Sequence, residues 1–187
     1  MKRLNHLYEK ICNEENLRLA DKKARKGKLW QYGVQIHDKN REENIALLRK
    51  MLKNKTYRTS DYTKFTIYEP KEREVYRLPY FPDRITHQAV MNILELIFVS
   101  TFTADTYSCI KGRGIHGAVR NLREALKDEH KTKYCLKIDI KKFYPSINHN
   151  ILKSLLRKKI KDKDLLWLLD EIIDSADGLP IGNYLSQ

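Results

Sequence analysis

The chain has 187 residues, of which 41% are hydrophobic and 33% charged, and 37 Lys and Arg against 24 Asp and Glu give a net charge of +13. This apolar content supports a packed core and excludes a disordered chain. No run approaches the ~18 consecutive apolar residues that span a bilayer, so no membrane partner is expected. The first residues also lack the apolar stretch of a signal peptide. Three cysteines, odd in number and far apart, predict no disulfide framework, and we expect a reducing cytoplasm.

The positive charge favours nucleic acid as a partner, and a solvated basic surface is the alternative. Eleven tyrosines support the first interpretation, because their rings can stack on bases. One run concentrates the charge around Gly27, and its cations are Lys22, Lys23, Arg25, Lys26 and Lys28. This run is interpreted either as a phosphate-contacting arm or as a solvated loop.

The first half of the chain predicts helices followed by a hairpin. The first thirty residues have helical spacing, and a second helix starts near Asn40, which forms a capping box with Glu43. Alternating β-branched and aromatic residues predict strands at 63–68 and 74–78, joined by a turn at 69–72.

The second half predicts mostly helices. Asp83 is placed to cap the first of them, and strict alternation predicts a strand at 134–140. The helices are expected near 83–98, 115–126, 148–158 and 163–174. Helices with a few strands in an irregular order favour an α+β fold.

Asp139 is the strongest chemical signal in the chain. It is a lone carboxylate on the polar face of the predicted strand, directly before a sharp turn that ends at Pro145. Such a carboxylate can ligate Mg²⁺, and two such ions can drive phosphoryl transfer. The alternative is an exposed aspartate paired with Lys137.

The stretch LKIDIKKFYPSINH resembles motif A of the reverse transcriptase family, in the bacterial branch related to group II introns. The resemblance implies that Asp139 is the catalytic metal ligand and that the Ile140 carbonyl ligates the same ion. It also implies that the amides of the following turn, including Phe143, hold the triphosphate. Tyr144 would exclude a ribose 2′-hydroxyl by steric clash, and core packing is the alternative for this ring.

The segment GLPIGNYLSQ is similar to motif B of the same family. There Gly178, Gly182 and Ser186 would let the backbone approach the template and the incoming base pair. Ile181 and Gln187 stand where the intron-encoded pattern has Gln and Pro. Both variants resemble the enzymes of diversity-generating retroelements and of unclassified or phage-defence groups, for which error-prone synthesis is expected.

The stretch KEREVYRLPYFPDRITHQAV resembles the family's fingers motif. By this resemblance Arg73 and Arg77, with Lys71 second, would clamp the triphosphate, because a guanidinium binds phosphate bidentately. A solvated hairpin is the alternative for these cations. Arg84 would contact the template or serve a structural role.

The segment TYSCIKGRGIHGAVRNL resembles the part of the family that precedes motif A. Lys111 and Arg113 would there offer cations to a nucleic-acid backbone, beside the N-terminus of the helix that begins near Ile115.

The resemblance implies a right-hand polymerase fold. The expected divisions are a helical N-terminal extension with fingers helices at 1–60, fingers with the basic hairpin at 61–130, and a partial palm at 131–187, truncated and without a thumb. The family's second acidic motif does not occur in these residues, so this chain is expected to be inactive alone.

The implied function is RNA-directed DNA polymerisation with an RNA template, a DNA primer, dNTP and Mg²⁺, or Mn²⁺ in its place. A small basic accessory protein is a further implied partner, and exposed palm surface predicts self-association. A non-catalytic RNA-binding module that keeps the polymerase fold is the alternative.

Overall fold

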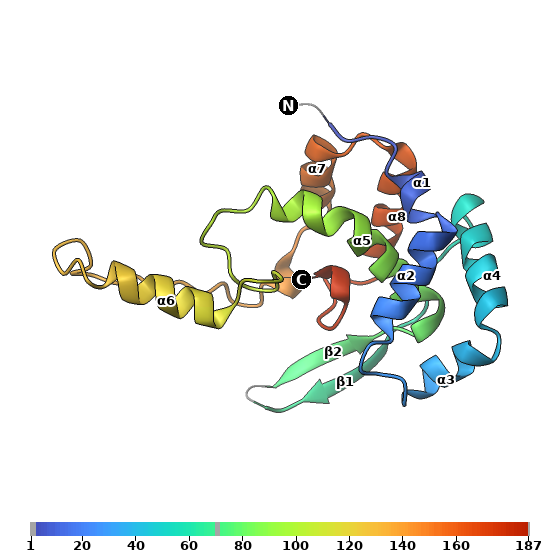
Figure 1. Cartoon of the computed structure of the whole chain (residues 1–187), viewed down its shortest axis with the longest axis horizontal. Helices are drawn as coiled ribbons and strands as arrows, with labels where there is room; N and C mark the ends of the chain where they lie inside the picture. Colours follow the sequence, from blue (N-terminus) through green and yellow to red (C-terminus); the bar gives the residue numbers. More distant parts are fainter. Residues whose placement is uncertain (1–2, 70–71, 187) are drawn as a thin grey trace. The chain divides into compact units, whose positions relative to one another are not determined.

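The computed structural model describes residues 3–69 and 72–186, which form helices and one two-stranded sheet (Figure 1). The α-helices are α1 (Tyr8–Ile11), α2 (Glu14–Ala24), α3 (Tyr32–Lys39), α4 (Arg41–Lys53), α5 (Ile85–Val99), α6 (Ile115–Ala125), α7 (His149–Lys159) and α8 (Lys163–Ile173). Shorter elements are η1 (Tyr80–Arg84), a kinked turn in which Phe81 is not helical, and the 3₁₀ turns η2 (Tyr144–Ser146) and η3 (Tyr184–Ser186). The predicted α+β class is confirmed.

The sheet is the predicted hairpin. Strand β1 (Thr63–Ile67) pairs antiparallel with β2 (Arg73–Arg77) in a register that sets Phe65 opposite Val75. Pro70 and Lys71, at the predicted turn, lie outside the described residues.

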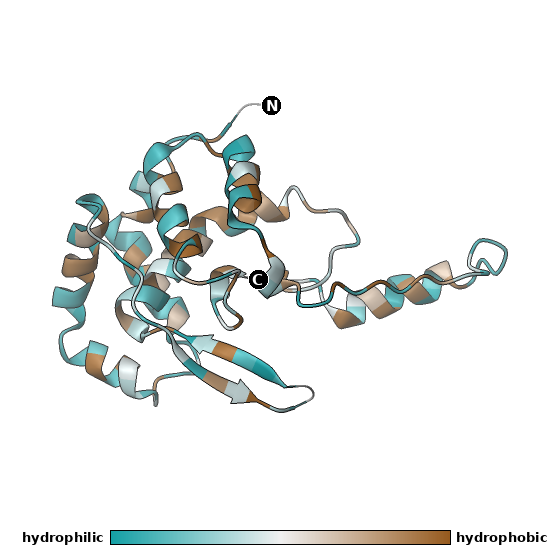
Figure 2. Cartoon of the chain, turned by 180° about the vertical axis from the view of Figure 1, so that it is seen from behind, coloured by the Kyte–Doolittle hydropathy of each residue, from teal (hydrophilic) through white to brown (hydrophobic). Residues whose placement is uncertain are grey.

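The chain divides into two compact units, Met1–Leu94 with Lys142–Ser186 and, second, Glu95–Lys141. The first unit holds a core in which fully buried side chains come from most of its helices, including Leu17, Leu48, Leu52, Ile85, Leu165 and Leu168. Among the described hydrophobic residues of the second unit, only Ile110 is buried. In Figure 2 hydrophobic residues recur along α6 in the second unit, and its apolar residues Ile115, Val119, Leu122 and Leu126 are exposed.

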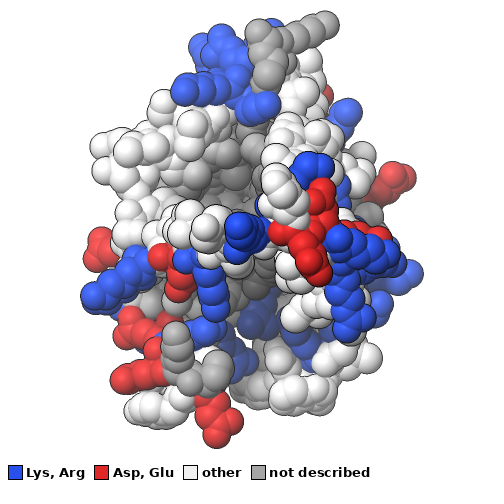
Figure 3. Space-filling view, turned by 90° about the vertical axis from the view of Figure 1, so that its left-hand side faces the viewer, with Lys and Arg blue, Asp and Glu red and all other residues white. Residues whose placement is uncertain are grey.

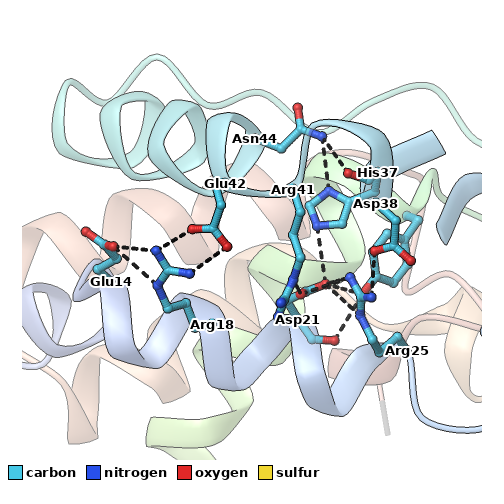
Figure 4. Close-up of polar contacts among 10 residues, drawn as sticks. Glu14, Arg18, Asp21, Arg25, His37, Asp38, Arg41, Glu42 and Asn44 are labelled. Atoms are coloured by element: carbon cyan, nitrogen blue, oxygen red, sulfur yellow. Dashed lines mark hydrogen bonds and ion pairs between the residues drawn. The ribbon is translucent and has the colours of Figure 1, made fainter. Parts of the chain in front are cut away.

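A buried carboxylate joins the N-terminal helices (Figure 4). Asp21 on α2 is fully buried and contacts Arg25, His37 on α3 and Arg41, which begins α4. It also accepts a hydrogen bond of 2.6 Å from the Tyr80 hydroxyl. Burial alone would raise the pKa of Asp21, but these bonds outweigh it and lower the pKa below its ordinary value. The network therefore fixes three helices and η1 relative to one another.

A second carboxylate anchors the start of the chain. Asp162 caps α8 by accepting from the Leu165 N–H, and its other oxygen accepts from the N–H groups of Leu7 (2.7 Å) and Tyr8 (2.9 Å). The backbone of Leu4 also bridges to the segment around Ile160. These bonds hold α1 against the α7–α8 connection.

Two of the predicted caps are wrong. Asn40 makes no side-chain capping bond, because α3 ends one residue earlier and leaves Asn40 outside the extended conformation of an N-cap. Asp83 is fully buried within η1, where one carboxylate oxygen accepts from the Tyr57 hydroxyl (2.7 Å) and the Ser60 N–H (3.2 Å). It therefore ties η1 to the segment before the hairpin and caps no helix.

Two predicted elements also differ from the structure. The single N-terminal helix is broken at Asn13, whose side chain caps α2 by accepting from the Glu15 N–H. Residues 134–140 form no strand, and the four side chains expected on one apolar face are exposed: Tyr134, Leu136, Ile138 and Ile140. A strand needs a neighbour to satisfy its backbone groups, and the described residues pair none with this segment.

Candidate functional site

The loop that resembles motif B lies along the free edge of β2. The Tyr76 N–H donates to the Ile181 carbonyl over 2.8 Å. Gly182 has φ +112°, and a Cβ there would lie 2.7 Å from the Tyr76 carbonyl oxygen and 3.0 Å from Val75 Cγ1. Glycine is required here because a larger residue would be strained and would push the loop off the strand.

The same loop is fixed at its other end to the turn that resembles the end of motif A. The Leu179 N–H donates to the Tyr144 carbonyl over 2.9 Å, and His149 Nε2 donates to the Gly178 carbonyl over 2.8 Å. Gly178 has φ +63°, and a Cβ there would lie 2.7 Å from the backbone of Pro145. One loop thus links the Tyr144 turn to the hairpin.

The basic residues of β2 flank this contact. Side chains two apart on a strand share a face, so Arg73, Val75 and Arg77 lie on one face of the hairpin. Val75 on that face is the side chain that Gly182 approaches. Both arginines are exposed. Gly182 therefore approaches Val75, which lies between Arg73 and Arg77 on this face of the strand.

A group of cations extends from Arg77. Arg84 is partly buried and donates to Gln31 Oε1 over 3.2 Å, and its pKa is lowered by burial and by Arg77. Burial and Arg84 in turn lower the pKa of Lys28. Each cation therefore disfavours charge on its neighbour, which a bound anion would relieve. The charge run already indicated Lys28, but its proximity to Arg84 depends on tertiary structure.

His87, one turn after Arg84, is fully buried, and burial together with Arg84 lowers its pKa to about 4. It is neutral at physiological pH and adds no charge to this group.

Other predicted residues of the first unit lie around the loop. Tyr144 is partly buried with its ring edge-on to that of Phe143, at a centroid distance of 5.4 Å. Ser186 ends η3, and its N–H donates to the Asn183 carbonyl. Lys71 lies outside the described residues.

The remaining predicted residues belong to the second unit. Asp139 and Ile140 are exposed in the irregular segment before the Tyr144 turn. Lys111 is exposed beside a cavity of about 590 Å³. Arg113 donates to the carbonyls of Thr103 (3.0 Å) and Thr106 (3.1 Å), so it holds its own loop closed.

The described residues do not complete a metal site. Across residues 3–69 and 72–186, no three side chains of His, Cys, Asp or Glu are grouped so as to hold an ion. Asp139 and the Ile140 carbonyl offer at most three oxygens, whereas Mg²⁺ takes about six.

The chain carries a net charge of +13. On the face drawn in Figure 3, Lys and Arg side chains occur in several groups, with Asp and Glu between them. Among the described residues, no helix combines the length and apolar character needed to cross a membrane.

Comparison with known proteins identifies distant relatives, while no family model matches the chain. It is 26% identical over 158 residues to the group II intron-encoded protein LtrA of Lactococcus lactis subsp. cremoris. The matched region covers 78% of this chain and 26% of LtrA. It is 24% identical over 161 residues to nuclear intron maturase 4, mitochondrial, of Arabidopsis thaliana, covering 82% of this chain and 20% of the maturase.

A third relative is protein YkfC of Escherichia coli strain K12, 25% identical over 136 residues, covering 64% of this chain and 36% of YkfC. The chain is therefore a distant homologue of group II intron proteins and spans about a fifth to a third of the length of these relatives. The predicted likeness to the group II intron branch is confirmed at this level.

Proposed function

We propose that the chain is the fingers and first palm part of an RNA-directed DNA polymerase with a right-hand fold. The observation that carries this proposal is the docking of Gly182 beside Val75, on the hairpin face that also presents Arg73 and Arg77. Two guanidinium groups next to a closely approaching backbone suit a triphosphate whose base pair stacks against that backbone.

The cations divide into two groups by their proposed roles. Arg73 and Arg77, with Lys71 second, bind the triphosphate of the incoming dNTP. Arg84 contacts a phosphate of the RNA template or DNA primer. Lys111 and Arg113, in the second unit, bind phosphates of the nucleic-acid backbone. The half-buried Arg84 supports this role, since it is close to Arg77 without a carboxylate partner among the described residues.

The turn at Tyr144 and the loop after Gly178 form the floor of this site in the proposal. The rigid Tyr144 ring rejects a 2′-hydroxyl, and the Phe143 backbone approaches the triphosphate. The bonds from Leu179 and His149 support these roles, because they hold the turn on the same loop as Gly182. Ser186 contacts the template strand at the end of that loop.

Asp139 and Ile140 would hold Mg²⁺, or Mn²⁺, together with oxygens from outside the described residues. When bound, the ion would neutralise charge on the triphosphate. The Ile181 side chain cannot form the hydrogen bonds that a Gln side-chain amide would form. This difference favours the retroelement or phage-defence branch and error-prone synthesis. A small basic accessory protein and self-association through exposed apolar residues complete the proposed partners.

The test is primer extension on an RNA template with the protein made from the natural gene, whatever its length. Asp139→Asn should abolish nucleotide addition and leave RNA affinity nearly unchanged, because the substitution leaves every basic residue of the chain in place. Asp105→Asn is a matched control, because it is another exposed aspartate of the second unit.

Substantial residual addition by Asp139→Asn would exclude Asp139 as a metal ligand. If the wild-type protein binds RNA with a strong salt dependence and adds no nucleotide, the non-catalytic RNA-binding module replaces the polymerase.

A further inference from the structure

We infer that Asn183 and Tyr62 are positioning residues that hold the motif-B-like loop on the fingers hairpin. This inference deepens the proposed function and rests on it. The observation is a chain of hydrogen bonds that joins the segment before β1, the end of α8 and the loop.

The direction of each bond follows from the groups available. Ser175 Oγ donates to the Ile172 carbonyl over 2.7 Å, so its hydroxyl proton is already used. The Tyr62 hydroxyl must then donate to Ser175 Oγ, at 2.8 Å, and its oxygen accepts from Asn183 Nδ2 at 2.9 Å. The chain therefore runs from Asn183 through Tyr62 and Ser175 to α8.

Because these hydrogen-bonded groups are buried, each of them depends on its partner in the chain of bonds. Asn183 is only 6% exposed, and Tyr62 is partly buried with its pKa raised by burial. An amide or hydroxyl left without a partner in such surroundings is destabilising. The loop therefore has one favoured position, in which the Asn183 side chain donates to the Tyr62 hydroxyl.

This position of the loop also fixes the hairpin strand β2 relative to Gly182. The Tyr62 ring packs edge-on against Tyr76, with 5.6 Å between centroids, and the Tyr76 N–H donates to the carbonyl of Ile181, two residues before Asn183. Lys64 lies over the other ring of this pair, 4.6 Å from the Tyr76 centroid. Asn183 and Tyr62 thus fix β2 and Gly182 in one register, and β2 carries Arg73 and Arg77.

The polar groups of Tyr62 and Asn183 bond to each other and to Ser175, so we expect each residue to act through Gly182 and the arginines. Loss of the Asn183–Tyr62 bond should weaken the binding of dNTP more than the chemical step. A single neutral hydrogen bond corresponds to about a three- to tenfold change in affinity.

The experiment uses the protein made from the natural gene in steady-state primer extension. Asn183→Ala and Tyr62→Phe should each raise KM for dNTP about three- to tenfold with kcat changed less than twofold. The double variant should be no worse than the more affected single variant, because the Asn183–Tyr62 bond is already lost in each single variant. Tyr68→Phe is the control, since Tyr68 follows β1 and is 73% exposed.

A second readout is independent of catalysis. In the 187-residue chain, amide hydrogen exchange at Tyr76 should accelerate in Asn183→Ala and remain unchanged in Tyr68→Phe. Unchanged KM and Tyr76 exchange in Asn183→Ala, or additive effects in the double variant, would overturn the inference. Faster Tyr76 exchange with KM unchanged would leave a merely structural bond, and it also overturns the positioning role. A wild-type protein without nucleotide addition instead rejects the proposed function, and the inference with it.

Discussion

Gly182 provides the sharpest test of the site, because two separate physical terms act at one residue. At φ +112° an alanine is strained, and its Cβ would lie 2.7 Å from the Tyr76 carbonyl oxygen. That oxygen belongs to backbone, so the loop itself has to move. Movement of the loop breaks the bond from the Tyr76 N–H to the Ile181 carbonyl.

The size of the effect follows from these terms. Backbone strain at a non-glycine residue in this region is about 1–3 kcal/mol, and the lost hydrogen bond adds about 1 kcal/mol. We therefore expect Gly182→Ala to lower the free energy of unfolding by about 2–4 kcal/mol. That is a large fraction of the ~5–15 kcal/mol that stabilises a typical domain.

Gly27→Ala is the matched control. Gly27 also has a positive φ, +70°, but no atom lies within 4 Å of a Cβ built there. Its effect should be strain alone, about 1–2 kcal/mol. Both variants are compared with the wild-type chain by urea unfolding followed by circular dichroism. Equal losses in the two variants would refute the close approach of Gly182 to β2.

Three further predictions concern other parts of the molecule. Arg77→Ala should raise KM for dNTP several-fold in primer extension with a smaller change in kcat, whereas a loss confined to RNA affinity would place Arg77 on the template. Asp162→Ala should lower the free energy of unfolding by about 2–4 kcal/mol in urea, because the buried N–H groups of Leu7 and Tyr8 lose their acceptor; a loss below about 1 kcal/mol would contradict this. Burial and a neighbouring guanidinium hold the pKa of His87 at about 4, so only the unfolded chain takes up this proton between about pH 6.5 and 4. The free energy of unfolding should fall by about 3 kcal/mol as the pH drops through this window, and His87 should cause no pH dependence above it. His87→Gln should flatten this part of the pH profile.

The elements with a strong local pattern could be predicted from the sequence. The hairpin has β-branched and aromatic residues in alternation, and β1 and β2 lie within one residue of the predicted bounds. Helices α6, α7 and α8 also follow their apolar spacing, because that spacing alone selects a helix over a strand.

Contacts between distant segments could not be predicted in the same way. The sequence indicates that Gly178 and Gly182 permit a close backbone approach. It does not indicate that the backbones of Pro145 and Tyr76 are the ones approached. Asp83 has the position of a helix cap, yet the Tyr57 hydroxyl and the Ser60 N–H compete for its carboxylate from 23 or more residues away. Tertiary donors of this kind override the local preference of Asp83 for a cap.

The segment at 134–140 shows why a correct alternation can still predict the wrong structure. Its apolar side chains occur at every second position, but Tyr134 is 89% and Leu136 82% exposed. Alternation selects the face that a strand would bury, whereas the strand itself forms only when a neighbour pairs with its backbone. The helix α6 forms without such a neighbour, because its backbone bonds are internal. Within the second unit the same exposed surroundings therefore permit a helix at 115–125 and leave Asp139 on an unpaired segment.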